Sequence, residues 1–289
     1  MTSTDVVRAR FPRAASNLRR FGGAMTRSLE EAGKLGWFTV VGGRDMAWAV
    51  TRYRTEILRL IAQIGMGTGA MAVVGGTAVI ISFVTLSAGS LVALQGFASF
   101  SQIGIQALLG FVAALINVRL VAPVVSGIVL AATVGAGATA ELGAMRISEE
   151  VDALEVMGIN SMAYLVSTRA LAGLVVIIPL YSLGLIMSFL SPAVVTTVLY
   201  GQASGTYEHY FFTFLRPNDV FWSFAEVIVM AGVVMLTHCY YGYNASGGPV
   251  GVGEAVGRSM RFSLVSVNVV VLLAEMALYG VNPNFAFTV

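Results

Sequence analysis

The chain has 289 residues, of which 57% are hydrophobic and 11% are charged, and its formal net charge at pH 7 is +2. Soluble domains carry about 25% charged residues. Residues 60–118, 120–140 and 170–207 of this chain contain no Asp, Glu, Lys or Arg. A soluble globular domain is excluded, because it would have almost no polar side chains to present to water. The composition predicts an all-α integral membrane protein.

The N-terminal part carries most of the positive charge. Residues 1–60 hold eleven of the seventeen basic side chains and five of the fifteen acidic ones, a net charge of +6, whereas the remainder has a net charge of −4. Under the positive-inside rule, a basic flank before the first span stays in the cytoplasm. We interpret residues 1–35 as a basic cytoplasmic arm on anionic lipid, with an organelle transit peptide as the alternative. Residues 36–60 combine tryptophan with arginine and are expected to form an interfacial amphipathic helix, with a simple linker as the alternative.

Five apolar segments are long enough to cross the hydrocarbon core of a bilayer, which takes about 20 residues of helix. The predicted spans cover about 66–95, 104–142, 161–190, 220–241 and 262–281. The second is expected to be interrupted near Arg119 and Pro123, because proline removes a backbone donor and kinks a helix. The third is expected to end at Ser191–Pro192. Between spans, the sequence predicts a polar and aromatic loop over 193–219 and a tight glycine-rich turn over 242–253.

The number of spans determines which connections share a side of the membrane. With a cytoplasmic N-terminus, the segment between the second and third spans and the glycine-rich turn are both cytoplasmic. The 193–219 loop and the C-terminus then fall outside. The aromatic side chains of residues 200–215 predict either a belt at the membrane interface or a contact for an extracytoplasmic partner.

A short acidic helix is predicted over about 147–158, between the second and third spans. Ser148 is the expected N-cap and Gly158 the expected C-terminal stop. The helix is too short and too charged to cross a bilayer, so it lies at a membrane face. Its spacing predicts one apolar stripe, formed by Ile147, Val151, Leu154 and Met157.

We interpret this acidic helix as a docking element for a water-soluble partner. The stripe would enter a groove of the partner, and the acids would pair with basic side chains. An amphipathic connector on lipid headgroups is the alternative, but anionic lipid repels so many acids. The predicted docking residues are Glu149, Glu150, Asp152, Leu154, Glu155 and Met157.

Small residues recur every four positions in the second span. They are Gly127, Ala131, Gly135, Thr139 and Gly143. Side chains at this spacing share one helix face, and small ones allow close backbone approach. We expect this ridge to pack tightly on another helix, either within the chain or across a dimer, and lipid-facing alanine and glycine is the alternative.

Several ionisable side chains fall in or near the predicted spans. They are Arg119, Glu141, Arg169, Glu226 and Glu275. Charge at membrane depth is costly, so these groups are expected to be paired or to line a polar cavity, and a transport role stays open. Arg169 is expected to snorkel towards the interface. Glu226 and Glu275 are candidate partners of Arg119.

The sequence contains no G-x-x-x-x-G-K-[ST] motif, and its two histidines and one cysteine argue against a transition-metal site. We find no nucleophile with an evident base, so we expect no enzyme activity and no cofactor bound by this chain. Nothing indicates nucleic-acid binding. The alternatives to a transporter subunit are a stand-alone secondary transporter or channel, and a membrane-embedded enzyme of lipid metabolism.

Two motifs around the acidic helix carry a family resemblance. The A-E-L-G-x-M pattern at 140–145 and the D-A-L-E-x-M-G pattern at 152–158, together with the glycine-rich segment 242–253, resemble the MlaE/YrbE family of lipid transporter permeases. The resemblance covers roughly 55–281.

This chain also departs from the family pattern. It has Leu120 where the family usually has an acid, Ala132-Thr133 in place of Gly-Arg, and Ser161 and Thr168 in place of proline. With its arginine-rich composition, the chain looks most like an actinobacterial (mycobacterial) YrbE protein of an Mce system.

The resemblance implies a permease subunit of an ABC-type lipid transporter in the plasma (inner) membrane. Residues 61–289 would form the permease domain and 147–158 the coupling helix, seated in a cytoplasmic ATPase that binds ATP and Mg²⁺. A second YrbE-type permease would complete a heterodimer, and Mce lipid-tunnel proteins would stand on the outer face. The cargo would be a fatty acid, mycolate, phospholipid or sterol, in a cavity lined by the first and fifth spans.

Overall fold

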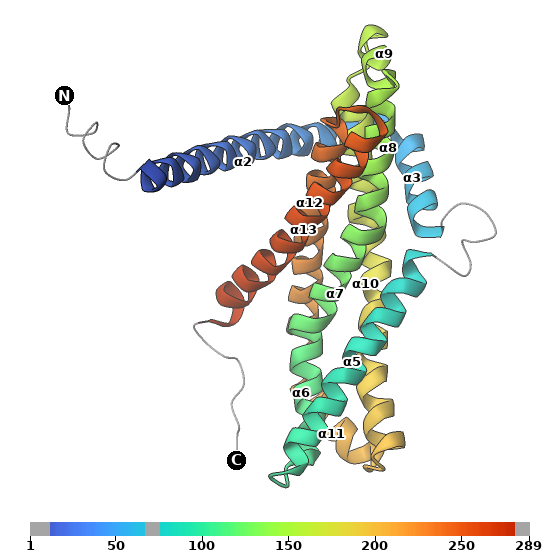
Figure 1. Cartoon of the computed structure of the whole chain (residues 1–289). Coiled ribbons are helices and arrows are strands. Elements are labelled where there is room, and N and C mark those ends of the chain that lie inside the picture. Colours follow the sequence, from blue (N-terminus) through green and yellow to red (C-terminus); the bar gives the residue numbers. More distant parts are fainter. Residues whose placement is uncertain (1–11, 67–75, 281–289) are drawn as a thin grey trace.

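The computed structural model describes residues 12–66 and 76–280, and every regular element in these ranges is a helix (Figure 1). Five of the described helical segments are long and apolar enough to cross a membrane. They are Thr77–Ser101, Gln106–Ile147, Met162–Leu199, Pro217–Tyr243 and Gly248–Tyr279. The prediction of an all-α integral membrane protein with five spans is therefore confirmed.

The helices follow one another in a simple order. Two precede the first span: α2 (Pro12–Arg52) and α3 (Arg54–Met66). The first span is α5 (Thr77–Ser101). The second is η1 (Gln106–Leu108), α6 (Leu109–Ile116), η2 (Asn117–Val121), α7 (Ala122–Leu130), η3 (Ala131–Gly135) and α8 (Ala136–Ile147). After α9 (Glu150–Val156), the third span consists of η4 (Met162–Ser167), α10 (Thr168–Val194) and η5 (Val195–Leu199). Helix α11 (Ser204–Phe214) follows, and the fourth and fifth spans are α12 (Pro217–Tyr243) and α13 (Gly248–Tyr279).

The third span does not end where the sequence predicts. Helix α10 contains Pro192 and continues to Val194, so the predicted end at Ser191–Pro192 is wrong. Proline has no backbone N–H and leaves the carbonyl oxygen four residues earlier without its helical donor. That oxygen belongs to Ser188, and it accepts a hydrogen bond from the Nδ2 of Asn117 at 2.9 Å. A side chain from the second span thus replaces the missing bond.

Two connections are more helical than the sequence predicts. The glycine-rich turn covers only residues 244–247, because α13 already begins at Gly248. A proline lies in the first turn of α13, where a backbone N–H would have no acceptor within the helix. The N–H that proline lacks therefore costs no helical hydrogen bond. The predicted loop over 193–219 contains η5 and α11, and the α11 side chains Tyr207 and Phe211 are buried against α6.

The interruption expected in the second span takes the form of two π-helical turns, η2 and η3, rather than a break. Turn η2 contains Arg119, and Pro123 follows it in the first turn of α7. A π-turn inserts one extra residue into a helix and already departs from the regular hydrogen-bond pattern. The loss of the backbone hydrogen bond at Pro123 is therefore accommodated next to it.

The N-terminal part of helix α2 extends away from the bundle of spans (Figure 1). Its C-terminal part packs against η4, α10 and α12. Phe38 and Ala49 are buried there, whereas Trp37 is exposed. The helix is continuous across the boundary expected between residues 35 and 36, and within residues 12–66 the helical path is interrupted only at Tyr53. Residues 1–11 of the arm predicted over 1–35, residues 67–75 at the beginning of the predicted first span, and residues 281–289 lie outside the described residues.

The small-residue ridge of the second span packs within the chain, on α12 and α13. A Cβ atom on Gly127 would lie 3.0 Å from the sulfur of Met230, and one on Gly135 would lie 2.5 Å from the ring of His238. One on Gly143 would lie 2.9 Å from a side chain of α13. The ridge thus lets three spans approach more closely than any larger side chain would permit.

Candidate functional site

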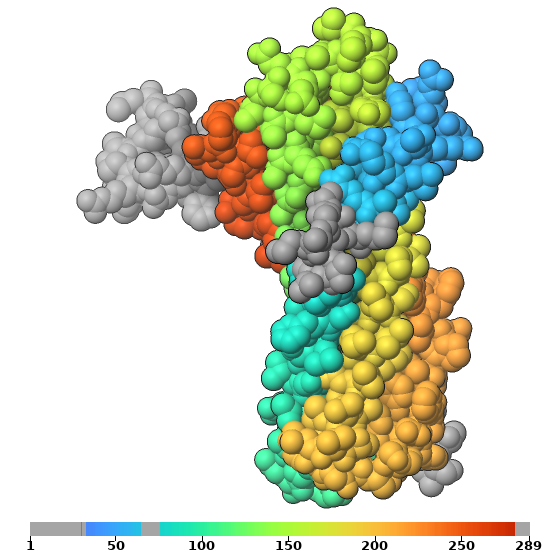
Figure 2. Space-filling model, turned by 90° about the vertical axis from the view of Figure 1, so that its right-hand side faces the viewer, coloured from blue at the N-terminus to red at the C-terminus, as the bar shows by residue number. Residues whose placement is uncertain are grey.

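The acidic helix α9 lies at one end of the molecule, beyond the spans (Figure 1; Figure 2). It joins α8 through Ser148 and Glu149. Ser148 donates a hydrogen bond from its Oγ to the carbonyl oxygen of Ala144 at 2.9 Å, so it ends α8, and the prediction that it caps the acidic helix is wrong. Glu149 precedes α9 with a φ of 62°, the one positive φ of a non-glycine residue in the described ranges. Such a conformation is strained for glutamate, and the turn before α9 therefore stores strain.

The other end of α9 follows the rule for helix termination that the sequence predicts. Gly158 has a φ of 76°, and its N–H donates to the carbonyl oxygen of Glu155 at 2.9 Å. The N–H of Ile159 donates to the carbonyl oxygen of Leu154 at 3.0 Å. These two bonds form a Schellman motif, in which glycine is the residue that adopts the left-handed conformation without strain.

Two members of the predicted apolar stripe, Val151 and Leu154, pack on this chain itself. Val151 is fully buried against Leu142 and Leu165, and Leu154 packs on the same cluster. The expectation that Val151 and Leu154 enter a partner's groove is therefore wrong. The groove that they fill is formed by this chain itself, because α8, η4 and α12 converge at the base of α9.

Three of the acids are already held by the chain's own side chains. Glu150 Oε1 accepts a hydrogen bond from Ser148 Oγ at 3.0 Å. Asp152 accepts a hydrogen bond from Arg146 Nη1 at 2.6 Å. Glu155 Oε1 accepts one from Ser161 Oγ at 2.6 Å and a longer one from the hydroxyl of Tyr243 at 3.2 Å. These contacts attach α9 to α8, to the start of η4 and to the last residue of α12.

The face of α9 that points away from the molecule is apolar at its tip. Val156 is 89% exposed and Met157 is 64% exposed, and Glu149 and Glu150 are exposed at the opposite end of the helix. Sequence reasoning found Met157, but it missed Val156, because helical spacing alone placed this residue among the polar positions. No local signal determines how a seven-residue helix is rotated on its support.

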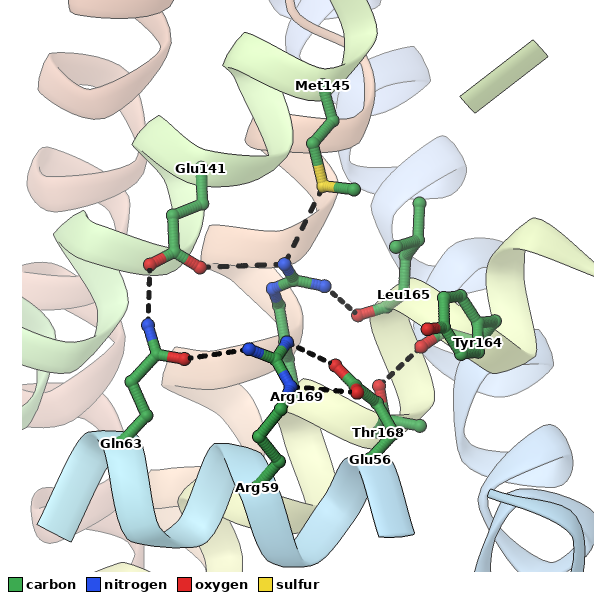
Figure 3. Close-up of polar contacts among 9 residues, drawn as sticks. All are labelled: Glu56, Arg59, Gln63, Glu141, Met145, Tyr164, Leu165, Thr168 and Arg169. Carbon is green, nitrogen blue, oxygen red and sulfur yellow. Dashed lines mark hydrogen bonds and ion pairs between the residues drawn. The ribbon is translucent and has the colours of Figure 1, made fainter. Parts of the chain in front are cut away.

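Beneath α9, a polar network joins three helices (Figure 3). Arg169, 6% exposed, lies 3.5 Å from Glu141 Oε2 and donates from Nη1 to the carbonyl oxygen of Leu165 at 3.1 Å. Arg169 therefore does not snorkel, as the sequence analysis expected, because α8 supplies a carboxylate next to it. Glu141 in turn accepts a bond from Gln63 Nε2 on α3 at 3.3 Å.

Helix α3 contributes its own ion pair to the same network. Arg59 donates from Nε to Glu56 Oε2 at 2.9 Å and lies 3.5 Å from the amide oxygen of Gln63 (Figure 3). The hydrogen bond from Arg59 lowers the pKa of the Glu56 carboxyl below its usual value. Gln63, Glu141 and Arg169 also line a cleft of about 250 Å³ between α3, α8 and α10.

The opposite half of the molecule contains an ion pair in which both side chains are shielded, whereas Glu141 of the Arg169 pair is half exposed. Arg119 Nη2 lies 2.9 Å from Asp219 Oδ2, and its guanidinium lies 3.8 Å from the centre of the Tyr279 ring. The candidate partners Glu226 and Glu275 are therefore not those that the structure uses. Glu226 is buried, and its Oε1 has no hydrogen-bond partner among the described residues. Sequence reasoning missed Asp219, whose position in the first turn of α12 suggests only a helix terminus.

Glu275 lies in a different setting from Glu226. It lines an open apolar cleft of about 620 Å³ between the second and fifth spans, which Arg119 and Asn268 also line. Within residues 12–66 and 76–280, no group of three or more His, Cys, Asp or Glu side chains could hold a metal ion.

Residues 66–277 match the family model described as Permease MlaE. The chain belongs to the MlaE permease family. A probable ABC transporter permease protein of Rickettsia bellii is 28% identical over 196 residues, which cover 68% of this chain and 74% of that protein. A probable ABC transporter permease protein of Synechocystis is 28% identical over 198 residues, 68% of this chain and 75% of that protein. The Arabidopsis thaliana protein TRIGALACTOSYLDIACYLGLYCEROL 1, chloroplastic, is 29% identical over 174 residues, 60% of this chain and 50% of that protein.

The match covers all five spans and α9 of this MlaE permease, whereas α2 and nearly all of α3 precede it. The Arg169–Glu141 pair thus lies inside the shared region, and the α3 side chains that extend its network lie outside. Family membership confirms the resemblance to MlaE permeases found in the motifs before and within α9.

Proposed function

We propose that this chain is the membrane subunit of an ABC-type lipid transporter and that α9 is its coupling helix. Helix α9 would dock on a separate cytoplasmic ATPase, which would bind ATP and Mg²⁺, and the permease itself would hydrolyse nothing. The observation that carries the proposal is the two-sided construction of α9. One face is fixed to the chain through Val151, Asp152 and Glu155, and the other presents Val156 and Met157 to water.

An apolar tip in water favours a partner. Burying a valine or methionine side chain is worth about 1.5–3 kcal/mol, and the tip gains this only by contact with another molecule. The exposed carboxylates of Glu149 and Glu150 suit a groove with a basic rim. We therefore assign docking chiefly to Val156 and Met157, with these two acids at the edge, and assign Asp152, Leu154 and Glu155 to holding the helix in place.

The proposed cargo is a hydrophobic lipid, and the proposed partner in the membrane is a second YrbE-type permease. The two spans that are least buried in this chain are α5, with 22% of its apolar window buried, and α13, with 17%. These helices therefore have faces free for lipid, cargo or another permease. The resemblance to actinobacterial YrbE proteins supports a heterodimer with Mce lipid-tunnel proteins on its outer face and a fatty acid, mycolate, phospholipid or sterol as cargo.

The proposed orientation places α9 and the N-terminus in the cytoplasm, with the protein in the plasma (inner) membrane. The positive-inside rule supports it, because residues 1–60 have a net charge of +6 and Arg146 lies at the same end as α9. Arg258 and Arg261 lie in the part of α13 that follows the short connection from α12.

Co-purification tests the docking assignment. The permease and its ATPase would be co-expressed, and Val156→Asp in the permease is expected to release the ATPase in detergent, because a charge replaces the apolar contact. Val250→Asp is the matched control: Val250 is 76% exposed in the first turn of α13, where an acid suits the helix dipole. Retention of the ATPase by Val156→Asp would refute docking through the tip. Proton- or voltage-driven flux through the purified chain alone would instead favour a stand-alone transporter.

A further inference from the structure

Three polar groups from three elements meet at the base of α9. The Oγ of Ser161, at the start of the third span, lies 2.6 Å from Glu155 Oε1 and 2.8 Å from the hydroxyl of Tyr243. The Tyr243 hydroxyl lies 3.2 Å from the same Glu155 oxygen. Ser161 is buried and Tyr243 is half-buried. Hydrogen bonds to a carboxylate are among the strong ones. Glu155 itself is exposed, so its bond from the Tyr243 hydroxyl lies at the surface, whereas Ser161 shields the other side of the cluster.

Tyr243 is also held from two other sides. The Arg146 guanidinium, which pairs with Asp152 of α9, lies 5.8 Å from the centre of the Tyr243 ring. The ring of Phe38, from α2, lies 6.0 Å from it. One side chain at the end of α12 therefore contacts groups from α2, α8, α9 and the start of the third span.

The backbone alone does not fix α9 to the spans. The chain enters α9 through Glu149, with a φ of 62°, and leaves it through Gly158, with a φ of 76°. Turns of this kind absorb changes in φ and ψ when one element moves against another. Helix α9 can thus pivot at both ends, and side-chain contacts decide which spans follow it.

The end of α12, in contrast, is packed without clearance on α8. A Cβ atom on Gly242 would lie 2.8 Å from the carbonyl oxygen of Thr139 and 2.9 Å from the Cβ of Leu142. Four residues earlier on α12, His238 Nδ1 lies 2.8 Å from the hydroxyl of Thr139. The C-terminal end of α12 and helix α8 therefore form a rigid unit, against which α13 packs. A movement of the Tyr243 side chain would displace this unit.

We propose that Tyr243 is a positioning residue that couples α12 to the movement of α9, through its hydroxyl and the Ser161–Glu155 pair. This inference rests on the proposed function, in which the ATPase grips α9. When the ATPase shifts α9, the Glu155 carboxylate carries the Tyr243 hydroxyl with it, and α12 and α13 follow. Without that hydroxyl, Val151 and the Arg146–Asp152 pair still attach α9 to α8 and η4, but α12 and α13 follow its movement less.

Spin labels on the assembled complex test this proposal without knowledge of the cargo. The permease, its partner permease and the ATPase would be placed in nanodiscs of phosphatidylethanolamine and phosphatidylglycerol. Labels would sit on Leu91→Cys of α5 and Phe221→Cys of α12, both exposed positions. Cys239 is fully buried and does not compete for the label. The distance between the labels would be measured with and without a non-hydrolysable ATP analogue.

Tyr243→Phe should keep the ATPase bound and hydrolysing ATP, but the nucleotide-dependent population shift should fall about tenfold, as expected for loss of a hydrogen bond to a carboxylate. Glu155→Gln should give the same result, and the double variant should lose no more than either single one. Tyr210→Phe, which removes a tyrosine hydroxyl from α11 at the far end of the molecule, should leave the shift unchanged. Unchanged thermal unfolding of Tyr243→Phe would separate this role from a purely structural one.

An unaltered shift in Tyr243→Phe, with the ATPase still bound, would overturn this inference and leave the proposed function intact. Release of the ATPase by Tyr243→Phe would also overturn it, because Tyr243 would then be needed for docking rather than transmission. If the unaltered chain retains no ATPase at all, the proposed function fails and the inference falls with it.

Discussion

The Arg119–Asp219 pair provides the sharpest prediction about stability. The two side chains are only 11% and 7% exposed, and their nearest charged atoms lie 2.9 Å apart. The hydroxyl of Tyr279 donates a further hydrogen bond to Asp219 Oδ1 at 3.2 Å, while its ring faces the guanidinium. Asp219 thus depends on Arg119 for its counter-charge, and both depend on the last residue of α13 for shielding.

Replacement of Arg119 by methionine should lower the free energy of unfolding by about 3–5 kcal/mol, the usual cost of leaving one member of a buried pair uncompensated. Loss of the cation–π contact with Tyr279 contributes about 0.5–2 kcal/mol of this. Asp219→Asn should cost less, because Glu275 lines the same cleft as Arg119 and offers it a second carboxylate. The double variant Arg119→Met/Asp219→Leu should recover most of the loss, since no buried charge remains unpaired.

Reversible unfolding in mixed micelles, followed by circular dichroism, would measure these differences. The interaction energy comes from the cycle of the two single variants and the double variant. If Arg119→Met is as stable as the double variant, Asp219 is not left uncompensated, and the argument from burial is refuted. An Asp219→Asn variant that is less stable than Arg119→Met would refute the role given to Glu275.

Two further predictions concern packing and pH. Gly135→Ala should destabilise the fold by about 1–3 kcal/mol, because its Cβ would overlap the His238 ring; Gly137→Ala, with open space around it, is the control. The same micelle assay would measure both, and equal stability of the two variants would contradict the packing argument. Glu56→Gln should lower stability at pH 7 by less than about 1 kcal/mol, since the Arg59 side chain that pairs with it is 61% exposed. Because the folded pKa of Glu56 lies below its ordinary value of 4.5, its stabilising effect is present above pH 4.5 and is lost as the pH falls below it. A stability difference between Glu56→Gln and the unaltered chain that persists unchanged at low pH would contradict this cause.

The features that the sequence predicts correctly are those set by short-range rules. Long apolar runs with few charges specify five spans, because each run is long enough to satisfy its own backbone bonds inside a bilayer. Gly158 specifies the end of α9, because the left-handed turn depends on one residue and its neighbours. The motifs before and within α9 predict the MlaE family for the same reason, since each lies within a few residues of chain.

Long-range contacts decided the rest. Arg119 pairs with Asp219 across 100 positions, and Pro192 stays within a helix because Asn117 of another span supplies the missing donor. Neither contact leaves a trace in local periodicity.

The rotation of α9 has the same origin. Spacing correctly groups Val151 with Leu154, but the convergence of α8, η4 and α12 turns this stripe inward and leaves Val156 and Met157 in water. The sequence by itself thus determined that a short acidic helix stands at the end of five spans. Only the tertiary structure decided which of its faces is held by the chain and which is open to a partner, because a helix of seven residues takes its orientation from the surface beneath it.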